Sequence, residues 1–427
     1  MAGSSPHRGS APDALRRTLG VTDAVVIGLG AMIGAGIFAA LAPAARAAGS
    51  GLLLGLALAA VVAYCNATSS ARLAARYPAS GGTYVYGRER LGDFWGYLAG
   101  WAFVVGKTAS CAAMALTFGA YAWPGQAHAV AVAAVVALTA VNYAGVRKSA
   151  LLGRVIVAVV LAVLAAVVVA ALTSDAVEFG RLDVGSDATA GGVFEAAGLL
   201  FFAFAGYARV ATLGEEVRDP ARTVRRAIPL ALGITLAVYV AVAVAVLAVL
   251  GPNGLAEASA PLSEAARAGG AEWLVPVVRL GAALAALGAL LALILGVSRT
   301  VLAMSRDRHL PPALAAVHPR FAVPHRAELL VGAVVAVVAA TGDVRAAIGF
   351  SSFGVLVYYA VANASAWTLA PDEGRPPRLV PAVGLAGCLV LAFALPASSV
   401  LAGAGVLALG AGVYAGARVV RRARGAR

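Results

Sequence analysis

Long apolar segments are the feature that most constrains how this chain of 427 residues can fold. A helix needs about 20 mostly apolar residues to cross a bilayer, and windows of that kind recur along the sequence. They lie at approximately 23–45, 51–71, 94–121, 127–145, 150–172, 192–213, 227–250, 273–303, 327–341, 346–370, 379–396 and 399–417. The sequence therefore predicts an all-α integral membrane protein with about twelve transmembrane helices.

The composition supports this class and excludes others. Hydrophobic residues make up 61% of the chain and charged residues 12%, whereas soluble domains carry about twice that share of charge. A disordered chain would need low hydrophobicity and high charge. The three cysteines, Cys65, Cys111 and Cys388, lie inside apolar segments, so we expect neither a disulfide framework nor a metal site. Nothing in the sequence suggests a cofactor.

The basic residues predict the orientation of the chain. With twelve spans, most of the 33 lysines and arginines fall on the side that holds both termini. The other side holds Arg46, Arg181, Arg267, Arg279 and Arg345. We therefore expect a multi-pass protein of the cell membrane with both termini in the cytoplasm. The net charge of +13 then reflects orientation and does not indicate a nucleic-acid partner.

Glycine clusters interrupt two of the predicted spans, at 28–36 in the first and at Gly206 in the sixth. Glycine costs up to about 1 kcal/mol inside a helix, so each interruption is a candidate unwinding point. Glycine could equally serve close packing between helices. The separation of five spans favours two five-helix repeats of inverted topology, at about 23–172 and 192–370, followed by two helices at 379–417. The expected organisation is a tail at 1–22, one transmembrane domain at 23–417 and a basic tail at 418–427.

Two interrupted helices that face each other suit a zwitterionic ligand. A half-helix presents free N–H groups and positive potential to a carboxylate at its N-terminal end. Unwound carbonyl groups can accept hydrogen bonds from an ammonium group. Exposed backbone at membrane depth is tolerated only where it lines a cavity. The paired breaks therefore indicate a binding site between the first and sixth spans.

Four segments in this order resemble the amino acid–polyamine–organocation (APC) superfamily, most closely its cationic-amino-acid-transporter-like branch. They are Gly30-Ala-Met-Ile-Gly34-Ala-Gly36-Ile-Phe38; Tyr77-Pro78-Ala-Ser80-Gly81-Gly82 with Gly96 to Trp101; Phe201-Phe202-Ala-Phe204-Ala-Gly206-Tyr207 with Glu215-Glu216-Val217-Arg218-Asp219-Pro220; and Met304-Ser305-Arg306-Asp307 with His318-Pro319. The resemblance implies an inverted repeat of five plus five helices (the LeuT-like arrangement) with spans one and six broken. It also implies a permease that moves amino acids or related amines, and no enzymatic activity.

The resemblance further implies which residues bind the substrate. The backbone of Ile33, Gly34, Ala35 and Gly36 would receive the carboxylate. The carbonyl groups of Phe202, Ala203 and Ala205, in the segment that ends at Gly206, would receive the amino group. Phe202 matches the aromatic residue that closes the outer side of the pocket in relatives.

Two aligned positions predict that transport is independent of sodium. Some relatives carry a lysine in span five in place of a sodium ion, and here Val157 stands at that position. Others bind sodium with hydroxyl groups in span eight, where this chain has Leu287 and Gly288. Apolar side chains are poor ligands for a hard cation.

Lys107 and Arg209 are charged residues inside predicted spans, where charge is costly and usually functional. Lys107 either carries a coupling proton or has a structural role, such as pairing with Glu195. Arg209 follows the second break, and relatives that take cationic substrates often have an acidic residue at the position of Ala208. We therefore expect neutral amino acids, with cationic amino acids or polyamines as the alternative. An exporter or exchanger is a further alternative, because no residue fixes the direction of transport.

Other functional classes fit the sequence less well. A membrane enzyme would need catalytic side chains clustered at one depth, and a channel would need rings of polar residues or a filter loop. The expected partners are an amino-acid substrate, membrane lipid and, if transport is proton-coupled, protons. Glu215 and Glu216 begin the loop after span six, beside Arg218, Arg222, Arg225 and Arg226, and are expected to form an intracellular ion-pair network or gate, which Arg88 and Glu89 could join. His318 and His325 are expected to be solvated.

Overall fold

The structure is a computed structural model that describes residues 19–77, 81–145, 150–211 and 217–425. Within these ranges the chain is almost entirely helical, and one bridge between Leu19 and Val217 is its only β interaction. The helices are α1 Val21–Met32, α2 Ala35–Ala39, α3 Leu41–Ala48, α4 Leu52–Arg76, α5 Thr83–Leu91, α6 Asp93–Ala122, α7 Ala127–Tyr143, α8 Ala150–Leu172, α9 Ala190–Phe204, α10 Ala208–Ala211, α11 Pro220–Glu257, α12 Pro261–Ala268, α13 Val275–Arg306, α14 His325–Thr341, α15 Val344–Trp367, α16 Leu379–Ala394 and α17 Ala397–Gly425.

The predicted class is confirmed. Ten helical stretches among the described residues are long and apolar enough to cross a membrane. Each of the twelve predicted spans overlaps a helix, although α14 and α16 are shorter, with 17 and 16 residues. The first predicted span is divided among α1, α2 and α3. At the other end of the chain, α17 continues as a helix to Gly425, through most of the segment expected to be a tail.

The contacts between helices follow a two-fold exchange of the two halves. Each helix of the first five spans has a counterpart five spans later: α1 and α9, α4 and α11, α6 and α13, α7 and α14, and α8 and α15. Exchanging the members of each pair turns the α1–α11 contact into the α9–α4 contact. The same exchange turns α6–α15 into α13–α8, and α4–α15 into α11–α8. Because five is odd, the second half crosses the membrane in the opposite sense. This pattern is the inverted repeat expected from the two helix breaks.

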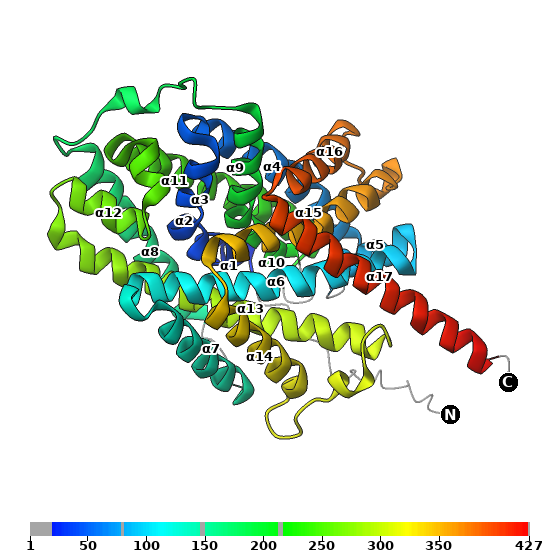
Figure 1. Ribbon diagram of the computed structural model, residues 1–427. Helices are drawn as coiled ribbons and strands as arrows, with labels where there is room; N and C mark the ends of the chain where they lie inside the picture. The colour runs from blue at the N-terminus through cyan, green and yellow to red at the C-terminus, as the bar shows by residue number, and fades with distance from the viewer. Residues whose placement is uncertain (1–18, 78–80, 146–149, 212–216, 426–427) are drawn as a thin grey trace, which may run out of the picture.

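The two halves are interleaved. Helices α1, α4, α9 and α11 pack together, and α6, α7, α13 and α14 form a second group beside them (Figure 1). We call the end of the bundle where α4 and α13 finish and α11 begins the basic side, because Arg76, Arg306 and Arg225 lie there. The end where α6 finishes and α15 begins is the opposite side. Of the two sides, sequence analysis predicted the basic side to be cytoplasmic.

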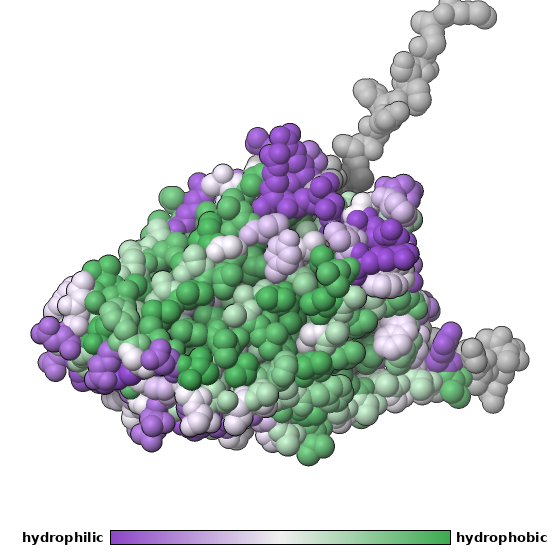
Figure 2. Space-filling view, turned by 90° about the horizontal axis from the view of Figure 1, so that it is seen from above, coloured by the Kyte–Doolittle hydropathy of each residue, from purple (hydrophilic) through white to green (hydrophobic). Residues whose placement is uncertain are grey.

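Large apolar side chains cover the outside of the bundle. Figure 2 shows a broad hydrophobic face between hydrophilic margins. Leu151, Val169, Phe393 and Leu401 are each more than half exposed. Helix α17 lies at the edge of the molecule and extends away from it (Figure 1). A continuous apolar surface of this size is what a lipid-embedded protein presents.

Candidate functional site

The first helix break lies where the glycine cluster predicted it. Helix α1 ends at Met32 and α2 begins at Ala35. Between them Ile33 has ψ 57° and Gly34 has φ −103° and ψ −144°, which are not helical values. Because the helix is interrupted here, the first N–H groups of α2 lack the carbonyl acceptors that a continuous helix would supply from one turn earlier. The predicted carboxylate-binding residues Ile33 to Gly36 are the residues that form this break.

The second break lies in the sixth span. Helix α9 ends at Phe204, a single 3-10 turn covers Ala205–Tyr207, and α10 follows. The predicted amine-binding carbonyl groups, those of Phe202, Ala203 and Ala205, belong to the end of α9 and to this turn. Of these three residues, Phe202 and Ala203 lie in the last turn of α9, and Ala205 lies in the 3-10 turn.

The structure brings the two breaks together. A Cβ atom added to Gly36 would lie 2.6 Å from the Cα atom of Ala203. One added to Gly206 would lie 2.1 Å from the carbonyl oxygen of Ala31. Only glycine allows backbones to approach this closely. These two glycines therefore fix the contact between the broken helices.

Buried tyrosine hydroxyl groups reach the carbonyl groups at the breaks. The Tyr239 hydroxyl lies 2.5 Å from the carbonyl oxygen of Met32 and 3.0 Å from that of Ala203, and bridges the two broken helices. The Tyr359 hydroxyl donates to the carbonyl oxygen of Ala205 at 3.4 Å. Unpaired backbone groups are costly at membrane depth, and these hydroxyl groups reduce that cost.

Lys107 also belongs to this site. Its side chain is 6% exposed, and its Nζ atom donates to the carbonyl oxygen of Ala205 at 3.4 Å. Its suggested partner, Glu195, lies elsewhere and contacts Nη2 of Arg345 at 3.6 Å. The expectation of a Lys107–Glu195 pair was therefore wrong, because the ammonium group faces the unwound backbone of the sixth span. Arg209 lies half-buried in α10, just past the break.

The side chains that face the first break from the scaffold helices are apolar. A Cβ atom on Gly30 would lie 3.0 Å from Cγ2 of Val157 in α8. One on Gly34 would lie 3.0 Å from Cβ of Ala289 in α13. Val157 was the residue that sequence analysis aligned with a cation-replacing lysine. Neither of these two side chains carries an oxygen atom that could bind a metal ion.

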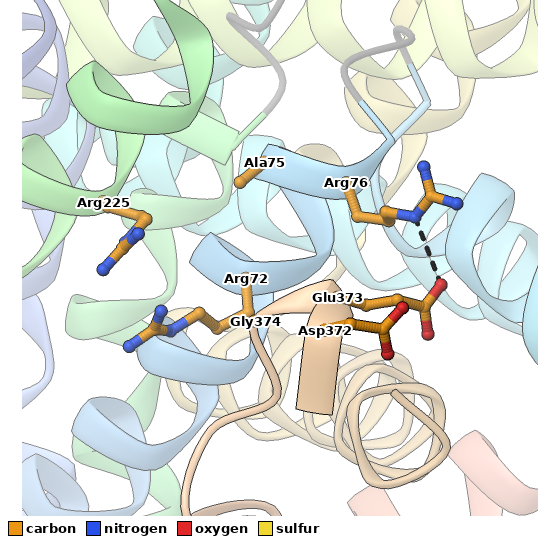
Figure 3. A pocket seen from close by; sticks show the side chains of 7 residues that line it. All are labelled: Arg72, Ala75, Arg76, Arg225, Asp372, Glu373 and Gly374. Carbon is orange, nitrogen blue, oxygen red and sulfur yellow. Dashed lines mark hydrogen bonds and ion pairs between the residues drawn. The ribbon is translucent and has the colours of Figure 1, made fainter. Parts of the chain in front are cut away.

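The predicted site is closed to both sides. Ile33, Phe202, Ala203 and Ala205 are at most 7% exposed. A cavity of about 530 Å³ on the opposite side is lined by Phe38, Thr117 and Tyr121 among others. A pocket of about 380 Å³ on the basic side is lined by Arg72, Ala75, Arg76, Arg225, Asp372, Glu373 and Gly374 (Figure 3). Neither cavity reaches the residues of the two breaks.

Phe202, the predicted gate, is buried in the last turn of α9 and lines neither cavity. The rings that border the opposite-side cavity are Phe38 and Tyr121, packed edge to face with centroids 5.7 Å apart. The Tyr121 hydroxyl donates to the carbonyl oxygen of Phe38 at 3.0 Å. This pair joins α2, next to the first break, to the end of α6.

Comparison with known proteins identifies the family. The amino acid permease family matches residues 19–412, which is nearly the whole described chain. The chain belongs to the amino acid permease family. It is 78% identical to an uncharacterized transporter of Mycobacterium tuberculosis over 97% of this chain and 94% of that protein. It is 25% identical to the branched-chain amino acid permease BcaP of Bacillus subtilis (90% and 89%), and 30% identical to cationic amino acid transporter 7 of Arabidopsis thaliana (82% and 65%). This supports the APC resemblance and identifies the chain as a transporter.

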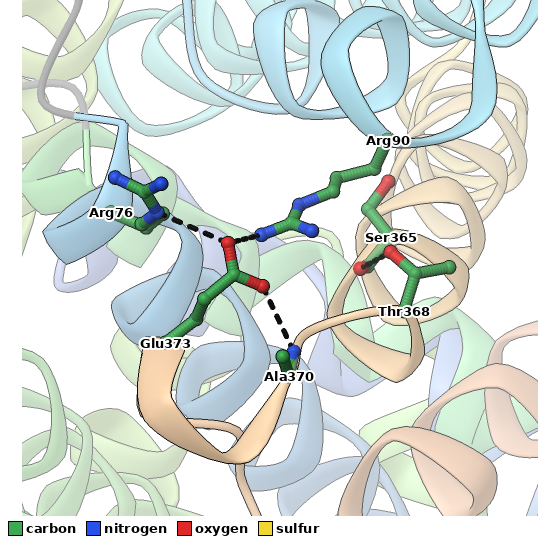
Figure 4. A network of polar contacts seen from close by, with 6 residues as sticks. All are labelled: Arg76, Arg90, Ser365, Thr368, Ala370 and Glu373. Atoms are coloured by element: carbon green, nitrogen blue, oxygen red, sulfur yellow. Dashed lines mark hydrogen bonds and ion pairs between the residues drawn. The ribbon is translucent and has the colours of Figure 1, made fainter.

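The basic side of this permease is tied together by an ion-pair network. Glu373, in the turn after α15, accepts hydrogen bonds from Nε of Arg76 at 3.2 Å, from Arg90 and from the backbone N–H of Ala370 at 2.9 Å (Figure 4). These donors, Arg90 first, lower the pKa of Glu373 from 4.5 to about 2. We call Arg76, Arg90 and Glu373 the basic-side latch. It joins α4 and α5 to the loop between α15 and α16.

A second contact on this side links α5 to the end of α13. Asp307 accepts hydrogen bonds from the Tyr84 hydroxyl at 2.5 Å and from Nη1 of Arg88 at 2.9 Å. Arg88 also contacts its neighbour Glu89 at 3.4 Å. Glu215 and Glu216, predicted to form an intracellular gate, lie outside the described residues.

Sequence reasoning missed several residues of the site. Tyr239, Tyr359 and Tyr121 gave little signal, because other polar residues, such as Thr235, Ser351 and Thr117, lie in the same spans. Glu373 gave no such signal, because its arginine partners come from helices almost 300 residues earlier.

Proposed function

We propose that this permease is a secondary active amino-acid transporter that works by alternating access. The observation that carries the proposal is the junction of two broken helices, which brings the N-terminal end of α2 and the irregular turn Ala205–Tyr207 into one region. That arrangement is complementary to the carboxylate and the amino group that amino acids share. The cavities on the two sides, which do not meet, are consistent with a carrier and not with an open channel.

We propose that the substrate is a neutral amino acid. The relatives include a permease named for branched-chain amino acids and a transporter named for cationic ones. Lys107 and Arg209 place two basic residues at or beside the second break. Fixed positive charge of this kind repels a second cation. This favours neutral substrates over arginine, lysine or polyamines, which form the alternative class.

We further propose that transport is independent of sodium, with both termini in the cytoplasm of a cell-membrane protein. Val157 and Ala289, which face the first break, supply no oxygen atoms for a sodium ion. The basic residues support the orientation. An exporter or exchanger would use the same site, because direction depends on gradients and coupling.

Uptake by the purified chain in proteoliposomes tests these proposals. The panel is leucine, alanine, arginine, glutamate and a polyamine, with sodium or choline in the medium. We expect leucine or alanine to accumulate equally in both media, with arginine a poor competitor. Dependence on sodium would refute the coupling proposal, and preference for arginine would refute the substrate proposal.

A further inference from the structure

A buried carboxyl group lies apart from the helix breaks, in the first turn of α14. Glu328 is 0% exposed, and in the described part of the chain neither of its carboxylate oxygens has a hydrogen-bond partner. Of the acidic residues in those ranges, Glu328 alone is fully buried. Burial of this kind disfavours the charged carboxylate and favours the protonated carboxyl group. An ionisable residue within a membrane domain is by default a functional site.

Helix α7 packs against this part of α14. A Cβ atom on Gly332 would lie 2.6 Å from Oγ1 of Thr139. Glu328 lies one turn before Gly332 on α14, and Tyr143 lies one turn after Thr139 on α7. Because the two helices are antiparallel, both residues lie one turn closer to the basic side, at the same level. The Thr139 hydroxyl is buried and, among the described residues, also lacks a hydrogen-bond partner. Two unpaired polar groups therefore share one helix interface.

Aromatic rings cap this interface on the basic side. The ring of Tyr143 packs edge to face against His318 and His325, with centroids 5.5 and 6.2 Å apart, and the two histidine rings are 5.5 Å apart. Both histidines are half-buried. His325 precedes Glu328 by three residues and therefore lies on the same face of α14. We call Tyr143, His318 and His325 the aromatic cap.

The cap contains the imidazole ring nearest in sequence to Glu328, that of His325. Nδ1 of His325 is buried without a hydrogen-bond partner in the described ranges. Nδ1 of His318 accepts from the backbone N–H groups of Arg320 and Phe321 at 3.2 and 3.3 Å, so that nitrogen carries no proton. A neutral imidazole can take up and pass on a proton near neutral pH.

The other charged groups around Glu328 are basic. From α13, the positive charge of Arg299 acts on Glu328. Arg320, in the connection before α14, lies over the ring of Phe321, and Arg326, in the first turn of α14, donates to the carbonyl oxygen of Ala313. From α6, Lys107 is directed to Ala205. Arg147 and Lys148, which follow α7, lie outside the described residues. Positive charge nearby favours ionisation once water reaches the carboxyl group.

We propose that Glu328 binds and releases a coupling proton, which it exchanges with the solution on the basic side through the aromatic cap. The step is a proton transfer: the O–H bond of the Glu328 carboxyl group breaks, the electron pair stays on the carboxylate, and the proton passes through His325 to water. Separation of α14 from α7 would admit that water to the carboxyl group, whose ionised form the positive charge of Arg299 on α13 already favours. The inference rests on the transport activity proposed above.

Amino-acid counterflow and pH-gradient-driven accumulation, measured on the same proteoliposomes, test this assignment. One proton moved per substrate across one pH unit supports an accumulation ratio of about ten. We expect Glu328→Gln to keep counterflow and to lose this accumulation. Glu195→Gln, which alters the ion-paired carboxylate of the sixth span, should keep both. A Glu328→Gln protein with wild-type accumulation would overturn the proposal. Absence of counterflow in the wild type would instead refute the proposed function.

Infrared spectroscopy of the wild-type chain gives a second test that does not need the glutamine variant to fold. We expect the carbonyl band of a protonated carboxylic acid to persist at about pH 6, where exposed carboxyl groups are ionised. The band should disappear in Glu328→Gln if that variant folds. Absence of the band from the wild type at that pH would overturn the assignment in every case.

Discussion

At the scale of single residues, the site is defined by polar atoms in apolar surroundings. Tyr239 is 1% exposed, yet its hydroxyl group reaches carbonyl oxygens on both broken helices. Lys107 reaches the unwound turn of the sixth span. Polar groups so placed persist in a membrane protein only when they have partners or a function.

Tyr239→Phe removes the bridging hydroxyl group and keeps the ring, which packs on Phe204 with centroids 5.1 Å apart. We expect a loss of about 1 kcal/mol in the free energy of unfolding, because a buried carbonyl group loses its donor. The substrate concentration that gives half-maximal counterflow should also change, because both affected carbonyl groups lie at the breaks. Tyr64→Phe, at a tyrosine that is 54% exposed, is the control and should change neither quantity. Identical thermal unfolding of Tyr239→Phe and the wild type would contradict the structural role.

Lys107→Gln tests the two roles left open for Lys107. The glutamine amide can still donate to the carbonyl oxygen of Ala205 but cannot carry a coupling proton. If Glu328 is the proton-binding group, the pH dependence of uptake between about pH 5 and 8 should survive this substitution. A flat pH profile in Lys107→Gln would assign the proton to Lys107.

At the scale of elements, the basic-side latch holds together segments that are distant in the sequence. The side chains of Arg90 and Glu373 are 15% and 17% exposed, so this pair is better shielded than a surface ion pair. It fastens α5 and the end of α4 to the α15–α16 loop. Opening of the basic side requires these elements to separate, so we infer that the latch stabilises the closed state.

The latch predicts a stability that depends on pH. The pKa of Glu373 is lowered from 4.5 to about 2 in the folded chain. Its contribution is therefore fully present above pH 4.5 and is lost as the pH falls through about 2. Melting temperatures at a series of pH values should show a gap between the wild type and Glu373→Gln that narrows on acidification below pH 4.5. Asp372→Asn, at the neighbouring exposed carboxylate, is the control. A gap that widens on acidification would contradict this account.

Much of the architecture could be predicted from the sequence, because membrane helices depend on local properties. Apolar runs located the spans, and glycine at 34, 36 and 206 located the breaks. Partners across the bundle could not be predicted. Neither the approach of Tyr239 to Met32 nor that of Glu373 to Arg90 has a local pattern. Glu328 looked like one of several acidic residues in cytoplasmic segments, because its burial depends on how α7, α13 and α14 pack.

At the scale of the whole molecule, the two halves enclose the buried junction of the broken helices, where we propose that the substrate binds. The cavities lie at opposite ends of the bundle, and the broken helices between them are reached by neither. Alternating access would connect each cavity in turn to the breaks. The inverted repeat provides two related arrangements of one set of helices, which such a cycle requires.

Counterflow of a labelled neutral amino acid tests the central claim most directly, with Gly36→Ala and Gly233→Ala measured beside the wild type. An added Cβ atom at Gly36 would meet the backbone of Ala203, whereas one at Gly233 in α11 would meet open space. We predict saturable counterflow for the wild type and Gly233→Ala. Gly36→Ala should lose counterflow, because separating the breaks costs about 1–3 kcal/mol and disrupts the site. Wild-type counterflow in Gly36→Ala, or none with any amino acid in the wild type, would contradict the account.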